Sequence, residues 1–224
     1  MKTILNAVIF LLFTLNVASQ TMTISLKNGK KVDYSLSDIE KITYSNNSNS
    51  FVDSRDGKEY KIIRIGNQIW MAENLNFETN GSYCYETRYS NCDVFGKLYT
   101  WNTAQNVCPT GWHLPSDSEW QTMIDYLGGN INAINKLKSS GSEYWGLSNS
   151  GNNSSGFHAL PGGYFTNAGR YSYIMIDGIW WTSSSYSNNS DRAWYRAIGQ
   201  SYSNLQAGHD QKNIAASVRC VKNN

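Results

Sequence analysis

The stretch CPTGWHLPSDSEWQTMIDYLGG, residues 108–129, holds the clearest structural signal in the sequence. Ser116 and Glu119 have the spacing of a capping box, in which each side chain bonds the backbone of the other residue. Pro115 keeps the chain extended before the cap, and Gly128 with Gly129 is a typical stop signal. Between these signals, apolar side chains recur at i, i+3, i+4 and i+7 and form one face, which comprises Trp120, Met123, Ile124 and Leu127. The pattern predicts an amphipathic helix.

Short apolar runs separated by glycine, asparagine and serine turns surround this predicted helix. They are typical of short strands and lie at residues 60–65, 68–71, 96–101, 156–160, 164–165, 179–182, 193–198 and 217–221. Ile131, Ile134 and Leu137 indicate a second, weaker helix, and a short helical turn is expected near residues 103–107. The fold class that we expect is α+β, with two helices and several short, mostly antiparallel strands.

The N-terminal residues 1–19 have the pattern of a cleaved secretory signal peptide. Lys2 supplies the positive charge, an apolar run covers residues 4–15, and Val17 and Ser19 supply small side chains before the expected cleavage site. The apolar run is too short to span a bilayer, and we expect no membrane span in the mature chain. The predicted localisation is therefore secreted or cell surface.

Residues 20–45 are predicted to form a small β-hairpin unit. Two alternating apolar runs flank Asn28 and Gly29, and this dipeptide favours a type I′ turn because both central residues need positive φ. A helical turn is expected at residues 37–40, and a short strand at residues 42–44. Residues 46–50 are a polar linker, and the main domain is predicted to cover residues 51–224.

Composition excludes some classes of function. The chain has 224 residues, a formal net charge of +2 and only 16% charged residues, but it contains 15 Tyr and 8 Trp. Such an aromatic-rich chain is not typical of disorder. It also lacks the basic stripe that phosphate binding requires, so we expect no nucleic-acid partner.

Our interpretation of the cysteines depends on the predicted export of the protein. Four cysteines are present and, in an oxidising compartment, they favour disulfides, for which three pairings exist. We favour Cys84–Cys92, which closes a short loop, and Cys108–Cys220, which ties the C-terminal strand to the middle of the chain. A zinc site is disfavoured because no C-x-x-C unit occurs.

Six separated motifs resemble a known protein family. They are IGNQIWMAENLN at 65–76, GKLYTW at 96–101, CPTGWHLPSDSEW at 108–120, LPGG at 160–163, WTSS at 181–184 and SVRCV at 217–221. In this order they resemble the Fibrobacter succinogenes major paralogous domain, over residues 51–222. The resemblance implies a secreted or cell-surface protein without a defined biochemical role. The helix entry and the closing Val-Arg strand are also similar to the C-type-lectin-like and formylglycine-generating-enzyme fold, which is therefore the expected architecture.

Exposed aromatic rings are the candidate ligand-binding residues. Tyr and Trp rings can stack on the apolar faces of sugars, while Asn, Gln and Ser side chains bind hydroxyl groups. Most rings are expected in the core, including Trp70, Trp101, Trp112 and Trp120. The rings that we select as candidates lie in the C-terminal half of the chain and are Trp145, Trp181, Tyr186, Trp194 and Tyr202.

Metal binding and catalysis have weaker signals. Asp177, Asp191 and Asp210 could supply calcium ligands, but aspartates in such loops are more often turn formers, and we predict no metal and no cofactor. His113 and His158 are interpreted as structural, and His209 as an exposed turn residue. No nucleophile–base grouping is visible, so we predict no catalytic residues.

Three hypotheses follow from these observations. The first is a secreted or cell-surface, non-catalytic binding or adhesion module, with polysaccharide as the candidate ligand. The second is a structural surface protein that binds other protein chains. The third is an enzyme on a formylglycine-generating-enzyme-like fold, which would need reactive cysteines.

Overall fold

A computed structural model describes residues 21–25, 29–36 and 49–223. The chain divides into two compact units, residues 1–47 and residues 48–224. The predicted signal peptide, the helical turn at 37–40 and the strand at 42–44 lie outside the described residues, as do Asn28 and most of the predicted linker. In the described part of the chain, no helix has the length and apolar character needed to cross a membrane.

The first unit contains an antiparallel strand pair. β1 (Thr21–Ser25) pairs with β2 (Lys31–Ser35), with Thr21 opposite Ser35 and Ile24 opposite Val32. These are the two strands predicted around Asn28 and Gly29. Ile24 and Tyr34 are exposed, as is expected of a two-stranded ribbon that has no core of its own.

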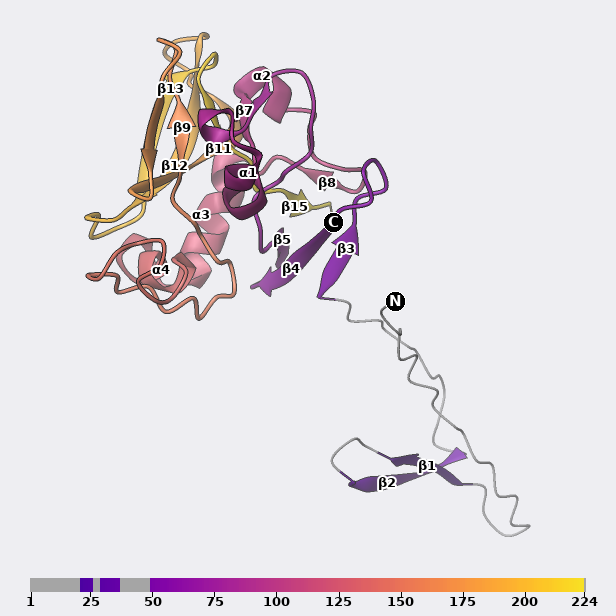
Figure 1. Ribbon diagram of the computed structural model, residues 1–224. Coiled ribbons are helices and arrows are strands. Elements are labelled where there is room, and N and C mark those ends of the chain that lie inside the picture. The colour runs from indigo at the N-terminus through magenta and orange to yellow at the C-terminus, as the bar shows by residue number, and fades with distance from the viewer. Residues whose placement is uncertain (1–20, 26–28, 37–48, 224) are drawn as a thin grey trace. The chain divides into compact units, whose positions relative to one another are not determined.

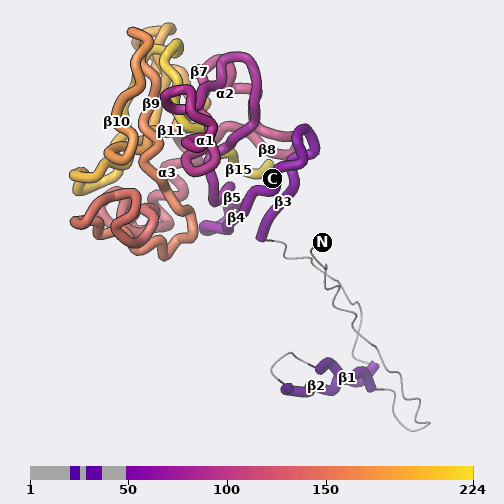
Figure 2. The backbone as a smooth tube through the Cα atoms, viewed as in Figure 1, coloured from indigo at the N-terminus to yellow at the C-terminus, as the bar shows by residue number. Residues whose placement is uncertain are grey.

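The second unit is built around an eight-stranded, mostly antiparallel sheet. Its strands are β6 (Ser82–Tyr83), β7 (Leu98–Thr100), β9 (Gly162–Phe165), β10 (Tyr171–Ile174), β11 (Asp177–Ser185), β12 (Arg192–Gly199), β13 (Gln206–Gln211) and β14 (Ala215–Ser217). Their order is β13-β12-β11-β9-β14-β7-β6, with β10 paired to β9. Figure 2 shows that β9, β10 and β11, in orange, gather on one side of this unit, whereas β15 lies away from them, near β8.

A five-stranded sheet brings the C-terminus back to the start of the second unit. Its strands are β3 (Ser50–Val52), β4 (Glu59–Ile65), β5 (Gln68–Met71), β8 (Trp112–His113) and β15 (Val221–Lys222). β15 lies between β5 and β8, with Val221 opposite both Trp70 and His113 (Figure 1).

The helices confirm the strongest local prediction and add one element that was not expected. α3 (Asp117–Tyr126) begins at the predicted capping box, because Glu119 N–H donates to Ser116 Oγ at 3.2 Å and Ser116 N–H donates to Glu119 Oε2 at 2.8 Å. α4 (Asn130–Leu137) is the second predicted helix. The expectation of two helices was too low. α2 (Trp101–Ala104) overlaps the short helical turn expected near residues 103–107 but begins earlier. α1 (Tyr89–Phe95) was not expected, because a helix of two turns is too short for apolar periodicity to show in the sequence.

The core contains the rings that the sequence placed there, with one exception. Trp70 and Trp120 are fully buried and make an edge contact at 5.1 Å, and Trp112 is also buried. Trp101 is only partly buried. The helices together with the two mostly antiparallel sheets of this unit confirm the mixed α+β class.

Both predicted disulfides are present. Cys84 bonds to Cys92, and Cys108 bonds to Cys220 across 112 residues of sequence, with Cα–Cα distances of 5.2 and 5.9 Å. These two bonds engage all four cysteines of the sequence, each of which lies in the described part of the chain.

Candidate functional site

Two of the five candidate rings are buried and cannot present a face to a ligand. Trp145 and Trp181 are 0% exposed. The Trp145 indole N–H donates to Ala159 O at 3.0 Å, and the Trp181 indole N–H donates to Tyr99 O at 2.9 Å. The prediction for these two residues was wrong. The polar segment around Trp145 places the Trp145 ring in the core, and the Trp181 side chain on β11 also points into the core.

Two other candidates, Tyr186 and Trp194, meet at one end of the larger sheet. Tyr186 follows β11, and Trp194 on β12 lies opposite His209 on β13. The Tyr186 and His209 rings stack with centroids 3.7 Å apart, and the Trp194 ring stands nearly perpendicular to both, at 5.3 and 5.7 Å. We call Tyr186, Trp194 and His209 the ring cluster.

His209 is a member of the cluster that the sequence did not predict. It was expected in an exposed turn, but it lies within β13 and is half-buried. β13 has the sequence QAGHDQ, which carries no strand signal of its own, and it forms by pairing with β12. The cross-strand position opposite Trp194 is the only signal that could have identified this residue, and it requires the register to be known.

Polar side chains accompany the ring cluster along the same face of β12. Alternation places Arg192, Trp194 and Arg196 on one side of the strand. Arg192 Nη1 lies 3.3 Å from His209 Nδ1. Arg196 Nε donates to Asp117 Oδ1 at 2.8 Å, at the start of α3. The rings are therefore flanked by hydrogen-bonding groups held in fixed positions.

The fifth candidate ring, Tyr202, lies at the other end of β12. Its N–H donates to Gly199 O at 3.3 Å, and its hydroxyl donates to Asp177 Oδ2 at 3.4 Å. Burial raises the pKa of Asp177 although Tyr202 and Lys138 oppose the shift. Burial also lowers the pKa of the Lys138 ammonium, which Asp177 partly offsets. Tyr202 therefore belongs to a separate environment from the ring cluster.

The three candidate calcium ligands are not brought together. Asp177 opens β11, Asp191 lies in the turn before β12, and Asp210 is on β13. Across residues 21–25, 29–36 and 49–223, no group of three His, Cys, Asp or Glu side chains is placed to hold a metal ion.

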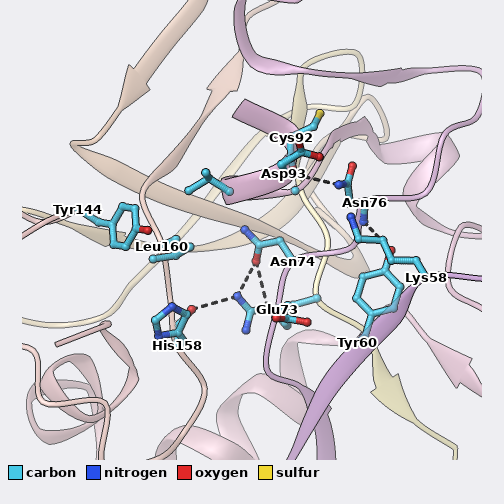
Figure 3. A pocket seen from close by; sticks show the side chains of 13 residues that line it. Lys58, Tyr60, Glu73, Asn74, Asn76, Cys92, Asp93, Tyr144, His158 and Leu160 are labelled. Carbon is cyan, nitrogen blue, oxygen red and sulfur yellow. Dashed lines mark hydrogen bonds between the residues drawn. The ribbon is translucent and has the colours of Figure 1, made fainter. Parts of the chain in front are cut away.

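A pocket of about 290 Å³ lies beside the buried residues Asn74 and Arg219 (Figure 3). Figure 3 shows Asn74 in the centre, His158 and Leu160 on one side, and Lys58 and Tyr60 on the other. Burial lowers the pKa of His158, and Arg219 adds to this shift, so the imidazole is neutral at pH 7.

The floor of this pocket is a hydrogen-bonded hub. Asn74 Oδ1 accepts hydrogen bonds from Arg219 Nη2 at 2.6 Å, from Arg219 Nε at 3.0 Å and from Trp180 Nε1 at 2.8 Å. Arg219 also donates to the carbonyl groups of Met71, Phe157 and His158. We call Asn74, Trp180 and Arg219 the hub.

The Arg219 charge has no carboxylate within ion-pair distance among the described residues. Burial lowers its pKa to about 9, and the charge of Glu73 partly offsets this shift. The guanidinium still remains charged at neutral pH, because its N–H groups are matched by carbonyl oxygens. Since those donors are already used inside the protein, they do not serve a ligand in the pocket.

The hub residues come from the motifs noted in the sequence or lie beside them. Asn74 belongs to IGNQIWMAENLN, Arg219 to SVRCV, and Trp180 directly precedes WTSS. The structure thus defines a disulfide-linked α+β domain whose recognisable motifs meet in its core.

Comparison with known proteins identifies the family. The family model for the Fibrobacter succinogenes major domain matches residues 63–222, and the chain belongs to this family. No curated protein and no solved structure matched the chain.

Proposed function

We propose that the chain is a secreted or cell-surface, non-catalytic binding or adhesion module whose ligand is a glycan. The observation that carries this proposal is the ring cluster, in which Tyr186, Trp194 and His209 meet while remaining partly exposed. Sites for small ligands combine aromatic surface with a few fixed polar groups. Arg192, whose Nη1 lies 3.3 Å from His209 Nδ1, supplies such a group beside the rings.

Two observations support the secreted or surface location and the absence of catalysis. Both cysteine pairs are oxidised, as is usual for proteins that pass through an oxidising compartment. An enzyme of the formylglycine-generating type needs a reactive thiolate, and all four thiols are engaged in disulfides. Thiol titration of the folded protein tests this point, and one reactive cysteine would restore the enzyme hypothesis.

The C-type-lectin-like architecture is part of the same proposal. It is supported by the capped entry into α3 and by the closing strand β15, which returns between β5 and β8. An experimental structure compared with known lectin-like domains tests it.

Glycan binding is tested with an array of plant and host polysaccharides followed by titration calorimetry. We expect at least one glycan to saturate the protein and Trp194→Ala to weaken its binding about tenfold or more, a loss of about 1.4 kcal/mol. Tyr126→Ala is the matched control, because Tyr126 is an exposed ring on α3 outside the cluster. Saturation by no glycan, or equal affinity of Trp194→Ala and the wild type, contradicts the proposal.

A second candidate function is the binding of another protein chain, and one surface feature favours it. Tyr173 in β10 and Met175 and Ile176 in the turn that follows are large apolar residues that are 50%, 41% and 45% exposed. Tyr173 and Met175 have positive φ values of 65° and 62°, a backbone conformation that is costly for residues other than glycine. Cross-linking on cells that recovers a protein partner through Tyr173 would favour this function over glycan binding.

A further inference from the structure

Two adjoining pockets share Asn102 of α2 in their lining. One has a volume of about 510 Å³ and is lined by Asp191, Lys212 and Asn213 among others. The other has a volume of about 260 Å³ and is lined by Phe77, Asn80 and Asn106 among others. Small-molecule sites typically occupy roughly 300–1,000 Å³. We call the surface formed by Asn80, Asn102, Asn106 and Asn213 the amide groove.

Hydrogen bonds to backbone carbonyl groups hold both walls of the groove against α2. On one side, Trp101 N–H donates to Lys212 O at 3.0 Å, and Lys212 N–H donates to Asp191 O at 2.9 Å. On the other side, Thr103 Oγ1 donates to Asn80 O at 3.0 Å. Gly81, with φ +77°, is required there because a Cβ atom would lie 2.3 Å from Thr103 Oγ1. The hydrogen bonds and the requirement for Gly81 therefore fix the walls of the groove as part of the fold.

The four amides of the groove are exposed and free. Within the described part of the chain, none of their side chains makes a hydrogen bond. Other asparagines form Asx turns in which Oδ1 accepts the N–H two residues later, as Asn149, Asn152 and Asn189 do. The groove amides do not serve as turn formers in this way, and each offers two donors and one acceptor oxygen outward.

The surroundings of the amides are aromatic and carry balanced charge. Arg55 lies over the Phe77 ring at 3.9 Å, and its charge is paired with Asp53 at 2.6 Å. Lys212 lies over the Trp101 ring at 4.2 Å, and Asp191 lines the same pocket. Amide groups beside ring surfaces, without an excess of either charge, suit an uncharged ligand that is rich in hydroxyl groups.

The amide groove begins where the ring cluster ends. Gln211 lines the larger pocket and lies two residues beyond His209 on β13, a spacing of about 7 Å along the strand. Asp191 lines that pocket as well and directly precedes Arg192, which contacts His209. A ligand longer than one sugar unit could therefore contact both the ring cluster and the amide groove.

We propose that the amide groove is a second subsite that binds a neutral sugar unit, so that the ligand is an uncharged oligosaccharide of several units. This inference rests on the proposed glycan-binding function and specifies its ligand class. The rings provide stacking surface at one end of the ligand, and the amides of Asn102 and Asn213 bind hydroxyl groups of the units that follow.

The test uses the ¹⁵N-labelled full-length protein, titrated with cellohexaose, xylohexaose and mannohexaose, with cellobiose as a short ligand and hexagalacturonate as a charged one. We expect at least one neutral hexasaccharide to shift both the Trp194 indole resonance and the side-chain amide resonances of Asn102 and Asn213. The double variant Asn102→Ala with Asn213→Ala should bind that hexasaccharide about tenfold more weakly. Asn67→Ala removes a free, exposed amide from the β4–β5 turn and is the matched control.

The outcomes separate this inference from the proposed function. Shifts at Trp194 without shifts at Asn102 and Asn213 would overturn the amide subsite and leave glycan binding intact. Shifts at Asn102 and Asn213 alone would support the subsite and contradict the role of the ring cluster. A preference for hexagalacturonate would contradict the neutral ligand class, and no shift with any saccharide would contradict both proposals.

Discussion

The hub and the amide groove use the same side chain, asparagine, in opposite ways. Asn74 in the hub is buried, and its amide bonds Arg219, Trp180 and the Phe95 carbonyl. Asn102 in the groove is exposed, and its amide has no partner in the described part of the chain. Unsatisfied polar groups are costly in a core but are available to a ligand at a surface.

The contrast also separates the residues that identify the family from those proposed to bind. Asn74 and Arg219 lie in the motifs by which the family can be recognised. Asn74 accepts a hydrogen bond from Trp180 on β11, and Arg219 donates to Met71 O on β5, so the pair links the two sheets. Asn213 and His209 lie outside the quoted motifs. The family motifs therefore report the fold of this chain, and its ligand has to be inferred from surfaces that the motifs do not cover.

The largest expected effect concerns the disulfide next to the hub. Replacing Cys108 and Cys220 by serine removes a cross-link that spans 112 residues, and the chain-entropy model predicts a loss of about 5 kcal/mol in unfolding free energy. The same change at Cys84 and Cys92, which are 8 residues apart, should cost about 2.5 kcal/mol. Urea unfolding of both double variants measures the difference. Equal losses would show that the long cross-link does not stabilise the hub region through chain entropy.

The second prediction breaks the hub itself. Asn74→Ala removes the oxygen that accepts three hydrogen bonds and leaves the buried Arg219 charge with fewer partners. We expect a loss of about 3–5 kcal/mol in unfolding free energy, which is typical when one partner of a buried charged group is removed. Urea unfolding measures the loss, and Asn76→Ala, in the same segment, is the comparison. A loss below about 1 kcal/mol would show that the hub is not a major source of stability.

Sequence reasoning succeeded where a local motif or the chemistry of a few cysteines limited the possibilities. The capping box of Ser116 and Glu119 fixes the start of α3 within four residues, and the disulfide pairing followed from the predicted export and loop closure. The hub could not be predicted, because Asn74 and Arg219 are 145 residues apart and meet only in the folded chain.

The sequence also identified only some members of the candidate site, because the others depend on long-range contacts. Tyr186 and Trp194 are partly exposed and remain candidates for ligand binding, but composition could not show that the segment around Trp145 packs inward. His209 and the groove amides became visible only through strand register and the packing of turns against α2.

The third prediction concerns the cap of α3 and its dependence on pH. Burial alone would raise the pKa of Glu119, but hydrogen bonds from Ser116 and His113 hold it below its usual value of 4.5. A carboxyl group with a lowered folded pKa stabilises the protein above its unfolded pKa, and this contribution is lost as the pH falls through the folded pKa.

Glu119→Gln should therefore remove part of the loss of stability that the wild type shows on acidification below about pH 4.5. The pKa of Asp53 is also lowered, so the difference between the wild type and the variant is the quantity to measure, by urea unfolding from pH 7 to pH 3. Ser116→Ala should cost about 1 kcal/mol at pH 7 through loss of the cap. Parallel pH curves for the wild type and Glu119→Gln would show that Glu119 does not contribute in this window.

The smallest expected effect on stability comes from the amide groove. Asn102→Ala and Asn213→Ala remove side chains that have no intramolecular hydrogen bonds among the described residues, so each should change the unfolding free energy by less than about 0.5 kcal/mol. Urea unfolding beside Asn74→Ala provides the direct comparison between the two kinds of asparagine. If Asn102→Ala destabilised the protein as strongly as Asn74→Ala, the groove amides would have a structural role, and their freedom to bind a ligand would no longer follow from the fold.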